Sequence, residues 1–291
     1  MPPETQVAPF DRLRSLLFAP AVRPDFLAKL PDRGADGVVI DCEDATPANA
    51  KAEARANVRQ VAPGLLGRGS QVFVRVNAVA SPWFEDDVAE ALVPGLAGIV
   101  VPKLESTEQA DRVDAALRAA GHPTLGVLAG IETALGVADA RPLLAHPRVR
   151  AAYFGAEDFI ADMGGVRTRE SREVLYGRSQ VALAGRLAGV PLLDQVVTDF
   201  KDDALFRSEC ADARALGYAG KLCIHPGQVA IANEAFVPSA EEVDHARRLL
   251  EAYAKAQAQG VAAIDFEGQM VDEPLASRAR QTLAAAPEET S

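Results

Sequence analysis

Along this chain, short apolar runs alternate regularly with longer amphipathic stretches. The runs have the length of β-strands, and the stretches between them repeat their apolar residues with a helical period. The eight runs are Leu13 to Ala19, Gly37 to Asp41, Gln71 to Asn77, Gly98 to Lys103, Thr124 to Glu132, Ala151 to Gly155, Val190 to Val197 and Lys221 to His225. The helical stretches are Pro24 to Pro31, Pro47 to Val61, Trp83 to Leu92, Ser106 to Ala120, Ala134 to Leu144, Ser171 to Leu187, Lys201 to Leu216 and Gln228 to Ala235.

This alternation predicts an α/β fold with a parallel sheet. Strands that are separated by a helix run parallel to each other, because the helix carries the chain back to the starting edge. Eight such units close most economically into a (β/α)8 TIM barrel, and the 291 residues of the chain are enough for one such barrel. The aromatic content of only 5% also fits helices packed on a parallel sheet better than a β-sandwich. An open, doubly wound sheet is the alternative.

The pattern changes near residue 238, which predicts a second part of the chain. We expect a barrel over residues 11–237 and a C-terminal helical extension over residues 238–291. The extension begins with a long helical stretch, Ala240 to Gln259, and continues through a glycine-containing segment, Gly260 to Pro274. A last short helix is expected from Leu275.

Charge and composition exclude several classes of protein. The formal net charge is −11, so the average surface field repels polyanions, and neither nucleic acid nor an anionic membrane is an expected partner. No uninterrupted apolar run reaches the length of about 18 residues that a membrane span needs, and the first residues carry no export signal. The three cysteines form no CxxC pair, which argues against a disulfide framework and a zinc site. We therefore expect a cytoplasmic protein.

Charged and polar residues follow most of the predicted strands. Because the carboxyl ends of parallel strands meet at one rim of a barrel, we expect these side chains to converge there. They are Asp41, Glu43, Asp44, Arg75, Asn77, Lys103, Glu132, Glu157, Asp158, Asp194 and His225. A convergence of this kind predicts a site for chemistry.

The residue types at this rim favour a magnesium site that binds an oxo acid or a hydroxy acid. Oxygen ligands without a cysteine or histidine cluster suit a hard divalent cation. Glu132 follows the apolar run Val127 to Ile131, where a buried carboxylate without a cation would be costly. Arg75 adds a planar fork that suits a substrate carboxylate. A metal beside such an arginine would stabilise the negative charge of an enolate or alkoxide.

Two other interpretations of the rim remain open. Acids at strand ends often cap the next helix or pair with a neighbouring strand. This alternative applies to Asp158 as an N-cap and to the group formed by Asp41, Glu43, Asp44 and Asp194. Lys103 at a strand end could instead form a Schiff base with a carbonyl substrate, as in a metal-free aldolase.

Seven motifs, in order along the chain, resemble the citrate lyase β subunit family within the HpcH/HpaI aldolases. They are Arg14 to Pro20, Gly34 to Asp44, Arg75 to Asn77, Val101 to Lys103, Ile131 to Thr133, Gly155 to Asp158 and Cys223 to Pro226. The resemblance covers roughly residues 13–236. It implies a TIM barrel, Mg²⁺ and a homotrimer or hexamer. It also implies reversible carbon–carbon cleavage of a 3-hydroxyacyl thioester into an acyl thioester and an oxo acid.

The resemblance also implies roles for individual residues. Glu132 and Asp158 match the metal ligands of the family, and Arg75 matches the arginine that binds the oxo-acid carboxylate. Asp41, Glu43 and Asp44 belong to an acidic motif that would hold these residues in position without binding the metal or the substrate. Cys42 in this motif replaces the usual leucine. Contacts to the phosphates of coenzyme A are expected from Arg14, Arg23 and Lys29.

The C-terminal segment Gly268 to Pro274 resembles the lid of malyl-CoA lyases and related enzymes. There an aspartate that matches Asp272 is thought to act as acid or base from a neighbouring subunit. The lid suggests a lyase that acts alone on a citryl-, malyl- or citramalyl-CoA type of thioester and releases oxaloacetate, glyoxylate or pyruvate. The alternatives are a citrate lyase β subunit that acts on an acyl-carrier-protein thioester within a complex, and a non-catalytic protein that only binds acyl-CoA.

Overall fold

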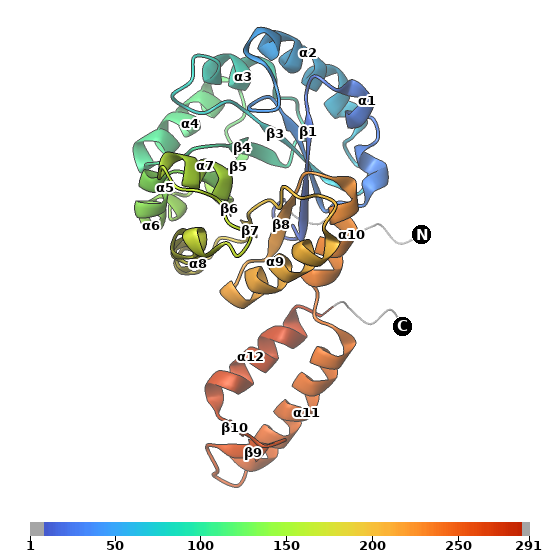
Figure 1. The fold of residues 1–291 in the computed structure, drawn as a ribbon, viewed down its shortest axis with the longest axis vertical. Helices are drawn as coiled ribbons and strands as arrows, with labels where there is room; N and C mark the ends of the chain where they lie inside the picture. The colour runs from blue at the N-terminus through green and yellow to red at the C-terminus, as the bar shows by residue number, and fades with distance from the viewer. Residues whose placement is uncertain (1–8, 287–291) are drawn as a thin grey trace. The chain divides into compact units, whose positions relative to one another are not determined.

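The computed structural model describes residues 9–286 and contains a closed barrel of eight parallel strands (Figure 1). The strands are β1 (Ser15–Pro20), β2 (Gly37–Asp41), β3 (Gln71–Arg75), β4 (Gly98–Val101), β5 (Gly126–Ile131), β6 (Val149–Phe154), β7 (Leu192–Asp194) and β8 (Gly220–Cys223). Each strand pairs with the next one along the chain, and β1 pairs with β8 to close the barrel. The predicted TIM barrel is confirmed.

Helices follow the strands around the outside of the barrel (Figure 1). The α-helices are α1 (Pro24–Leu27), α2 (Lys51–Val61), α3 (Phe84–Glu90), α4 (Thr107–Ala119), α5 (Ala134–Ala138), α6 (Ala140–Leu144), α7 (Ala156–Asp162), α8 (Leu175–Ala188), α9 (Asp203–Leu216) and α10 (Pro226–Ala235). Short 3-10 turns are η1 (Leu30–Arg33), η2 (Ala48–Ala50), η3 (Ala62–Gly64) and η4 (Arg172–Val174). None of the helices among the described residues has the length and apolar character that crossing a bilayer requires.

The interior of the barrel is filled by side chains from successive strands. The buried cluster includes Leu16, Val39, Phe73, Val100, Leu128, Tyr153, Leu193 and Leu222. Phe10 lies before β1 and packs edge-on against Phe73, with 5.3 Å between the ring centroids. Since both faces of each strand are buried, the strands are continuous apolar runs rather than alternating ones.

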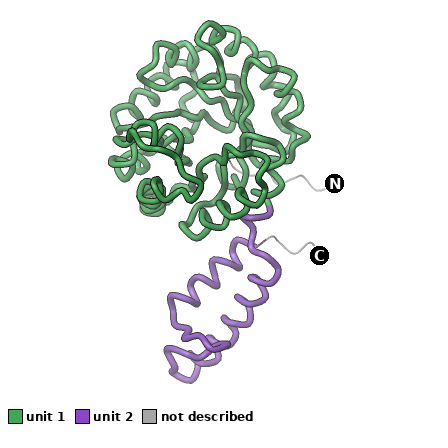
Figure 2. The backbone as a smooth tube through the Cα atoms, in the orientation of Figure 1, with its two compact units in different colours: residues 1–233 green, residues 234–291 purple. Residues whose placement is uncertain are grey.

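The chain divides into two compact units, residues 1–233 and residues 234–291 (Figure 2). The predicted boundary after residue 237 therefore falls inside the second unit, and residues 287–291 of the predicted extension lie outside the described residues. The second unit contains α11 (Ala240–Gln257), the antiparallel strands β9 (Ile264–Phe266) and β10 (Gln269–Val271), and α12 (Glu273–Ala284). Its own small core includes Leu249, Tyr253 and Val271.

Candidate active site

A cavity of about 450 Å³ opens at the carboxyl rim of the barrel. Its lining divides into two kinds of side chain. The charged part comes from Asp41, Asp44, Arg75, Glu132, Glu157 and Asp158. The apolar part comes from Phe18, Ala19, Pro20, Val196, Leu222 and Ile224. The barrel thus brings most of the predicted polar residues into one place, because they follow neighbouring strands.

Glu132 follows β5 directly, and its side chain is buried, with 2% exposed. Its Oε1 accepts hydrogen bonds from the backbone N–H of Lys103 (2.8 Å) and the hydroxyl of Tyr153 (3.2 Å). Its Oε2 lies against Gly155, where an added Cβ would stand only 2.3 Å away. Burial and, to a lesser extent, the charge of Asp158 raise the pKa of Glu132 to about 7, against the opposing charges of Arg75 and Lys103. The carboxylate is therefore held in place beside a second negative charge.

Asp158 lies in the first turn of α7, a helix that the sequence did not reveal. The N-cap of that helix is Gly155, without a side-chain hydrogen bond, so Asp158 does not act as the N-cap. No group of three or more histidine, cysteine or acidic side chains forms a metal site among residues 9–286. Two carboxylates, Glu132 and Asp158, nevertheless fit Mg²⁺, which takes one or two protein carboxylates and completes its coordination with water and substrate oxygens.

Arg75 at the end of β3 is held by the acidic motif that follows β2. Its Nε and Nη2 donate to the two carboxylate oxygens of Asp41, at 2.7 and 2.6 Å. Its Nη1 lies 3.0 Å from Glu43 Oε2. The planar fork that was expected to face a substrate carboxylate thus faces Asp41. Asp41 and Glu43 orient the guanidinium, as expected of supporting residues.

Lys103 places its ammonium group among the carboxylates at the rim. Nζ lies 2.6 Å from Glu43, 3.3 Å from Asp44 and 3.4 Å from Asp158. Burial alone would lower the pKa of Lys103, but the hydrogen bond and charge of Glu43, with the charges of Glu132 and Asp158, raise it overall. A lysine that forms a Schiff base must attack as the neutral amine. The surroundings of Lys103 therefore disfavour the metal-free alternative.

The three basic residues expected to contact coenzyme A lie in different places. Arg14 precedes β1, at the amino end of the barrel, where Nε and Nη2 each lie 2.7 Å from a carboxylate oxygen of Asp36. Arg14 therefore lies at the opposite end of β1 from Arg23 and Lys29. Arg23 and Lys29 follow the carboxyl end of β1, and both are exposed. Arg23 pairs with Asp25 at 2.8 Å.

Asp194 is a structural residue, although it also ends a strand. It is completely buried and accepts two hydrogen bonds from Arg178 of α8, at 2.7 and 2.8 Å. Lys221 of β8 also donates to it, and Glu209 of α9 lies 3.4 Å from Arg178. This buried network joins the barrel wall to two helices.

Asp272 lies in the second unit, at the N-cap of α12. Its side chain makes no capping hydrogen bond. The buried Oδ1 atom has no hydrogen-bond partner within residues 9–286. This carboxylate is not used to stabilise the helix on which it lies.

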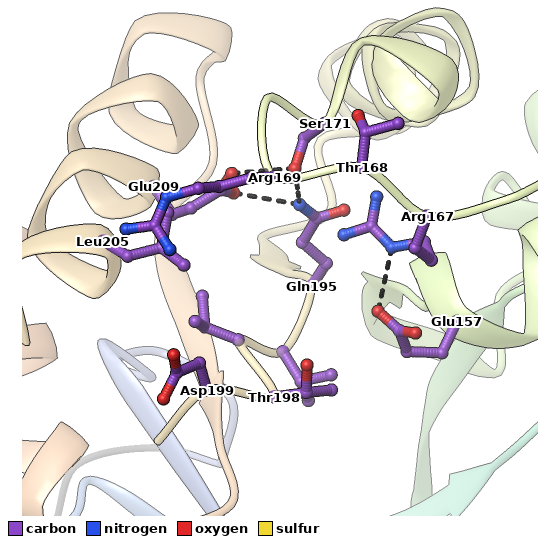
Figure 3. A pocket seen from close by; sticks show the side chains of 12 residues that line it. Glu157, Arg167, Thr168, Arg169, Ser171, Gln195, Thr198, Asp199, Leu205 and Glu209 are labelled. Atoms are coloured by element: carbon purple, nitrogen blue, oxygen red, sulfur yellow. Dashed lines mark hydrogen bonds and ion pairs between the residues drawn. The ribbon is translucent and has the colours of Figure 1, made fainter. Parts of the chain in front are cut away.

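A second, smaller cavity of about 250 Å³ shares Glu157 and Val196 with the first (Figure 3). On one side, Gln195 donates to Glu209 at 2.9 Å. On the other side, Arg167 donates to Glu157 at 2.9 Å. Figure 3 shows these two pairs facing each other across the cavity. This cavity could not be predicted from the sequence, because loop residues and residues of α7 and α9 line it together and form no recognisable motif.

The hydrogen bond from Tyr153 to Glu132 could not be predicted from the sequence either. Tyr153 lies inside β6 and reads as an ordinary core residue of an apolar run. The position of its hydroxyl depends on how β5 and β6 are aligned, where Gly130 pairs with Tyr153. Gly155 belongs to the motif Gly155 to Asp158, but its contact with Glu132 could not be predicted from the sequence.

Comparisons with known proteins agree with this geometry. The family model described as HpcH/HpaI aldolase/citrate lyase matches residues 14–226. A citrate lyase subunit beta-like protein from Deinococcus radiodurans is 52% identical, over 95% of this chain and 98% of that protein. The mitochondrial citramalyl-CoA lyase of Homo sapiens is 31% identical, over 94% of this chain and 85% of that protein. The crystal structure of CitE from Mycobacterium tuberculosis, in complex with magnesium, acetoacetate and coenzyme A, has a TM-score of 0.81 and 32% identity, and covers 95% of this chain and 98% of that chain.

Proposed function

Because the chain belongs to the HpcH/HpaI aldolase/citrate lyase family, we propose that it is a Mg²⁺-dependent carbon–carbon lyase. Its substrate is a 3-hydroxyacyl thioester, and its products are an acyl thioester and an oxo acid. The main support for this proposal is that Glu132, Asp158 and Arg75 line the same cavity at the barrel rim. A similar solved structure that contains magnesium, acetoacetate and coenzyme A supports it.

In this proposal Glu132 and Asp158 hold the metal ion. When bound, Mg²⁺ supplies positive charge that stabilises the developing negative charge on substrate oxygens. Arg75 binds the carboxylate of the part that becomes the oxo acid, as a planar guanidinium suits a carboxylate. To do so it turns part of its fork from Asp41 to the substrate, while Glu43 continues to hold its other side. Asp44 and Glu43 keep the Lys103 ammonium at the rim.

Two proton movements accompany cleavage of the carbon–carbon bond. A base removes the proton of the substrate hydroxyl, and that oxygen becomes the carbonyl oxygen of the oxo acid. The electron pair of the broken bond passes to the thioester fragment as an enolate, whose carbon then takes up a proton. We assign this second step to Asp272, whose side chain makes no capping hydrogen bond and would donate the proton as a carboxylic acid, becoming a carboxylate. The base gains one proton and Asp272 loses one, so the protein carries the same total number of protons before and after cleavage.

The lid and the surface cations favour coenzyme A over a carrier protein as the bearer of the thioester. Arg23 and Lys29 are exposed next to the first strand end and would contact the phosphates of coenzyme A. A lid that supplies Asp272 to a neighbouring subunit requires an oligomer, which we propose is the homotrimer or hexamer that the family resemblance implies. A citrate lyase β subunit that acts on an acyl-carrier-protein thioester is the second candidate.

Oxo-acid release from malyl-, citramalyl- and citryl-CoA in the presence of Mg²⁺ tests the proposal. We expect cleavage of at least one of the three, and the fastest identifies the oxo acid. A folded protein that binds Mg²⁺ and oxaloacetate but cleaves none of them would favour the carrier-protein alternative. Acyl-CoA binding without turnover of either kind of thioester would indicate the non-catalytic alternative.

A further inference from the structure

The side chain of Tyr153 lies inside the barrel, directly below the proposed metal site. Its residue is 2% exposed and belongs to the apolar cluster that fills the barrel. The aromatic ring therefore contributes to the core, but the hydroxyl extends beyond it. That hydroxyl donates to Glu132 Oε1 at 3.2 Å. A buried tyrosine hydroxyl usually has such a partner, because leaving it without one is costly.

The neighbouring strand leaves room for this hydroxyl. Gly130 of β5 pairs with Tyr153 in the barrel wall. A Cβ added at Gly130 would stand 2.5 Å from the tyrosine oxygen and 2.7 Å from the ring carbon that bears it. An alanine at this position would therefore displace the phenol group. A glycine in the middle of a strand carries a cost of its own, and here it permits the contact between the hydroxyl and Glu132.

The hydroxyl of Tyr153 contacts the carboxylate of Glu132, and the orientation of that carboxylate decides how it can bind a metal ion. The terminal torsion of a glutamate is soft, so contacts decide how its two oxygens point. Tyr153 and the backbone N–H of Lys103 both donate to Oε1. Gly155 lies against Oε2. Together these contacts fix the carboxylate in one orientation at the edge of the cavity.

We propose that Tyr153 is a positioning residue that orients Glu132 for Mg²⁺ through its hydroxyl. The inference rests on the proposed function, in which Glu132 holds the metal. Groups that hydrogen-bond to metal ligands fix the geometry of those ligands, and their loss typically weakens metal binding about 10- to 100-fold.

The substitution Tyr153→Phe tests this role, because it removes the hydroxyl and keeps the ring. Tyr218→Phe is the matched control, since Tyr218 is also buried and donates to the backbone oxygen of Arg178 at 2.8 Å, in the buried network around Asp194. Mg²⁺ affinity is measured by calorimetry on the full chain without substrate, and the free energy of unfolding by urea titration. We expect about tenfold weaker Mg²⁺ binding in Tyr153→Phe and unchanged Mg²⁺ binding in Tyr218→Phe, with a similar loss of stability in both.

The same experiment includes Glu132→Gln, so that the two proposals fail in different ways. If Glu132→Gln loses Mg²⁺ binding and Tyr153→Phe retains the wild-type affinity, the positioning role is overturned and the proposed function stands. Equal weakening by both tyrosine substitutions would show a general packing effect and also overturn the positioning role. If Mg²⁺ binding is absent from the wild type or survives in Glu132→Gln, the proposed function itself fails.

Discussion

At the scale of single residues, the site depends on one carboxylate that is held from three sides. Glu132 accepts from Tyr153 and Lys103 and lies against Gly155. The sequence predicted the carboxylate and its burial, because it follows an apolar run. It could not predict the contacts around it, because they join residues from three strands whose alignment is a property of the closed barrel.

The closeness of Gly155 to Glu132 leads to a first prediction. In Gly155→Ala, the new Cβ would meet Oε2 at 2.3 Å and the Cβ of Glu132 at 2.6 Å, so the carboxylate must move. We expect Mg²⁺ affinity to fall at least about tenfold and stability to fall by about 1–3 kcal/mol from overpacking. Calorimetry and urea titration measure the two effects.

Gly64→Ala provides the control, because nothing lies within 4 Å of a Cβ added there. This substitution should leave Mg²⁺ affinity unchanged. If Gly155→Ala bound Mg²⁺ as tightly as Gly64→Ala, the orientation of Glu132 described here would not be the one that binds the metal.

At the scale of strands and helices, the alternation of runs predicted all eight barrel strands, and each predicted run overlaps one of them. The differences have physical causes. α7 was missed because it has only 7 residues and begins directly after a strand, at Ala156. The hairpin of β9 and β10 was missed because each strand has 3 residues, which is too short for a pattern. The stretch from Ala134 to Leu144 forms two helices, α5 and α6, with Asp139 between them.

The buried ion network between β7, β8, α8 and α9 gives a second prediction. Asp194→Ala would leave Arg178 and Lys221 buried with the more distant Glu209, at 3.4 and 3.5 Å, as their remaining shared carboxylate. Loss of one partner from a buried ion pair costs about 3–5 kcal/mol, so the urea midpoint should fall sharply. In the control Glu85→Ala, the lost pair with Arg112 is half-exposed, and the midpoint should change little. Equal midpoints for the two variants would show that the network does not support the fold.

The position of Asp272 at the start of α12 gives a third prediction. Asp272→Ala should abolish most turnover, because the enolate loses its proton donor, while Mg²⁺ and oxo-acid affinities stay at wild-type values. The stability of the second unit should also change little, since the side chain makes no capping hydrogen bond. Glu273→Ala, which removes an exposed pair with Arg280, should keep full turnover. Unchanged turnover in Asp272→Ala would remove Asp272 from the mechanism.

At the scale of the whole molecule, the fold and the family could be predicted from the sequence, and the identity of the thioester could not. Residues 14–226 match the family model, which agrees with the extent of the motifs. The charged half of the cavity was predicted from strand ends alone. The apolar half, which includes Val196, Leu222 and Ile224, depends on which side of each strand faces the cavity. The identity of the thioester therefore has to be measured.

In the proposed function, cleavage depends on a metal ion held by Glu132 and Asp158. The most direct test measures oxo-acid release from the best thioester before EDTA, after EDTA, and after Mg²⁺ is restored. We expect EDTA to abolish release and Mg²⁺ to restore it, because the charge that develops on oxygen is otherwise not stabilised. If release continued at the same rate in EDTA, cleavage would not depend on a metal ion. A Schiff base on Lys103 would then be the better explanation.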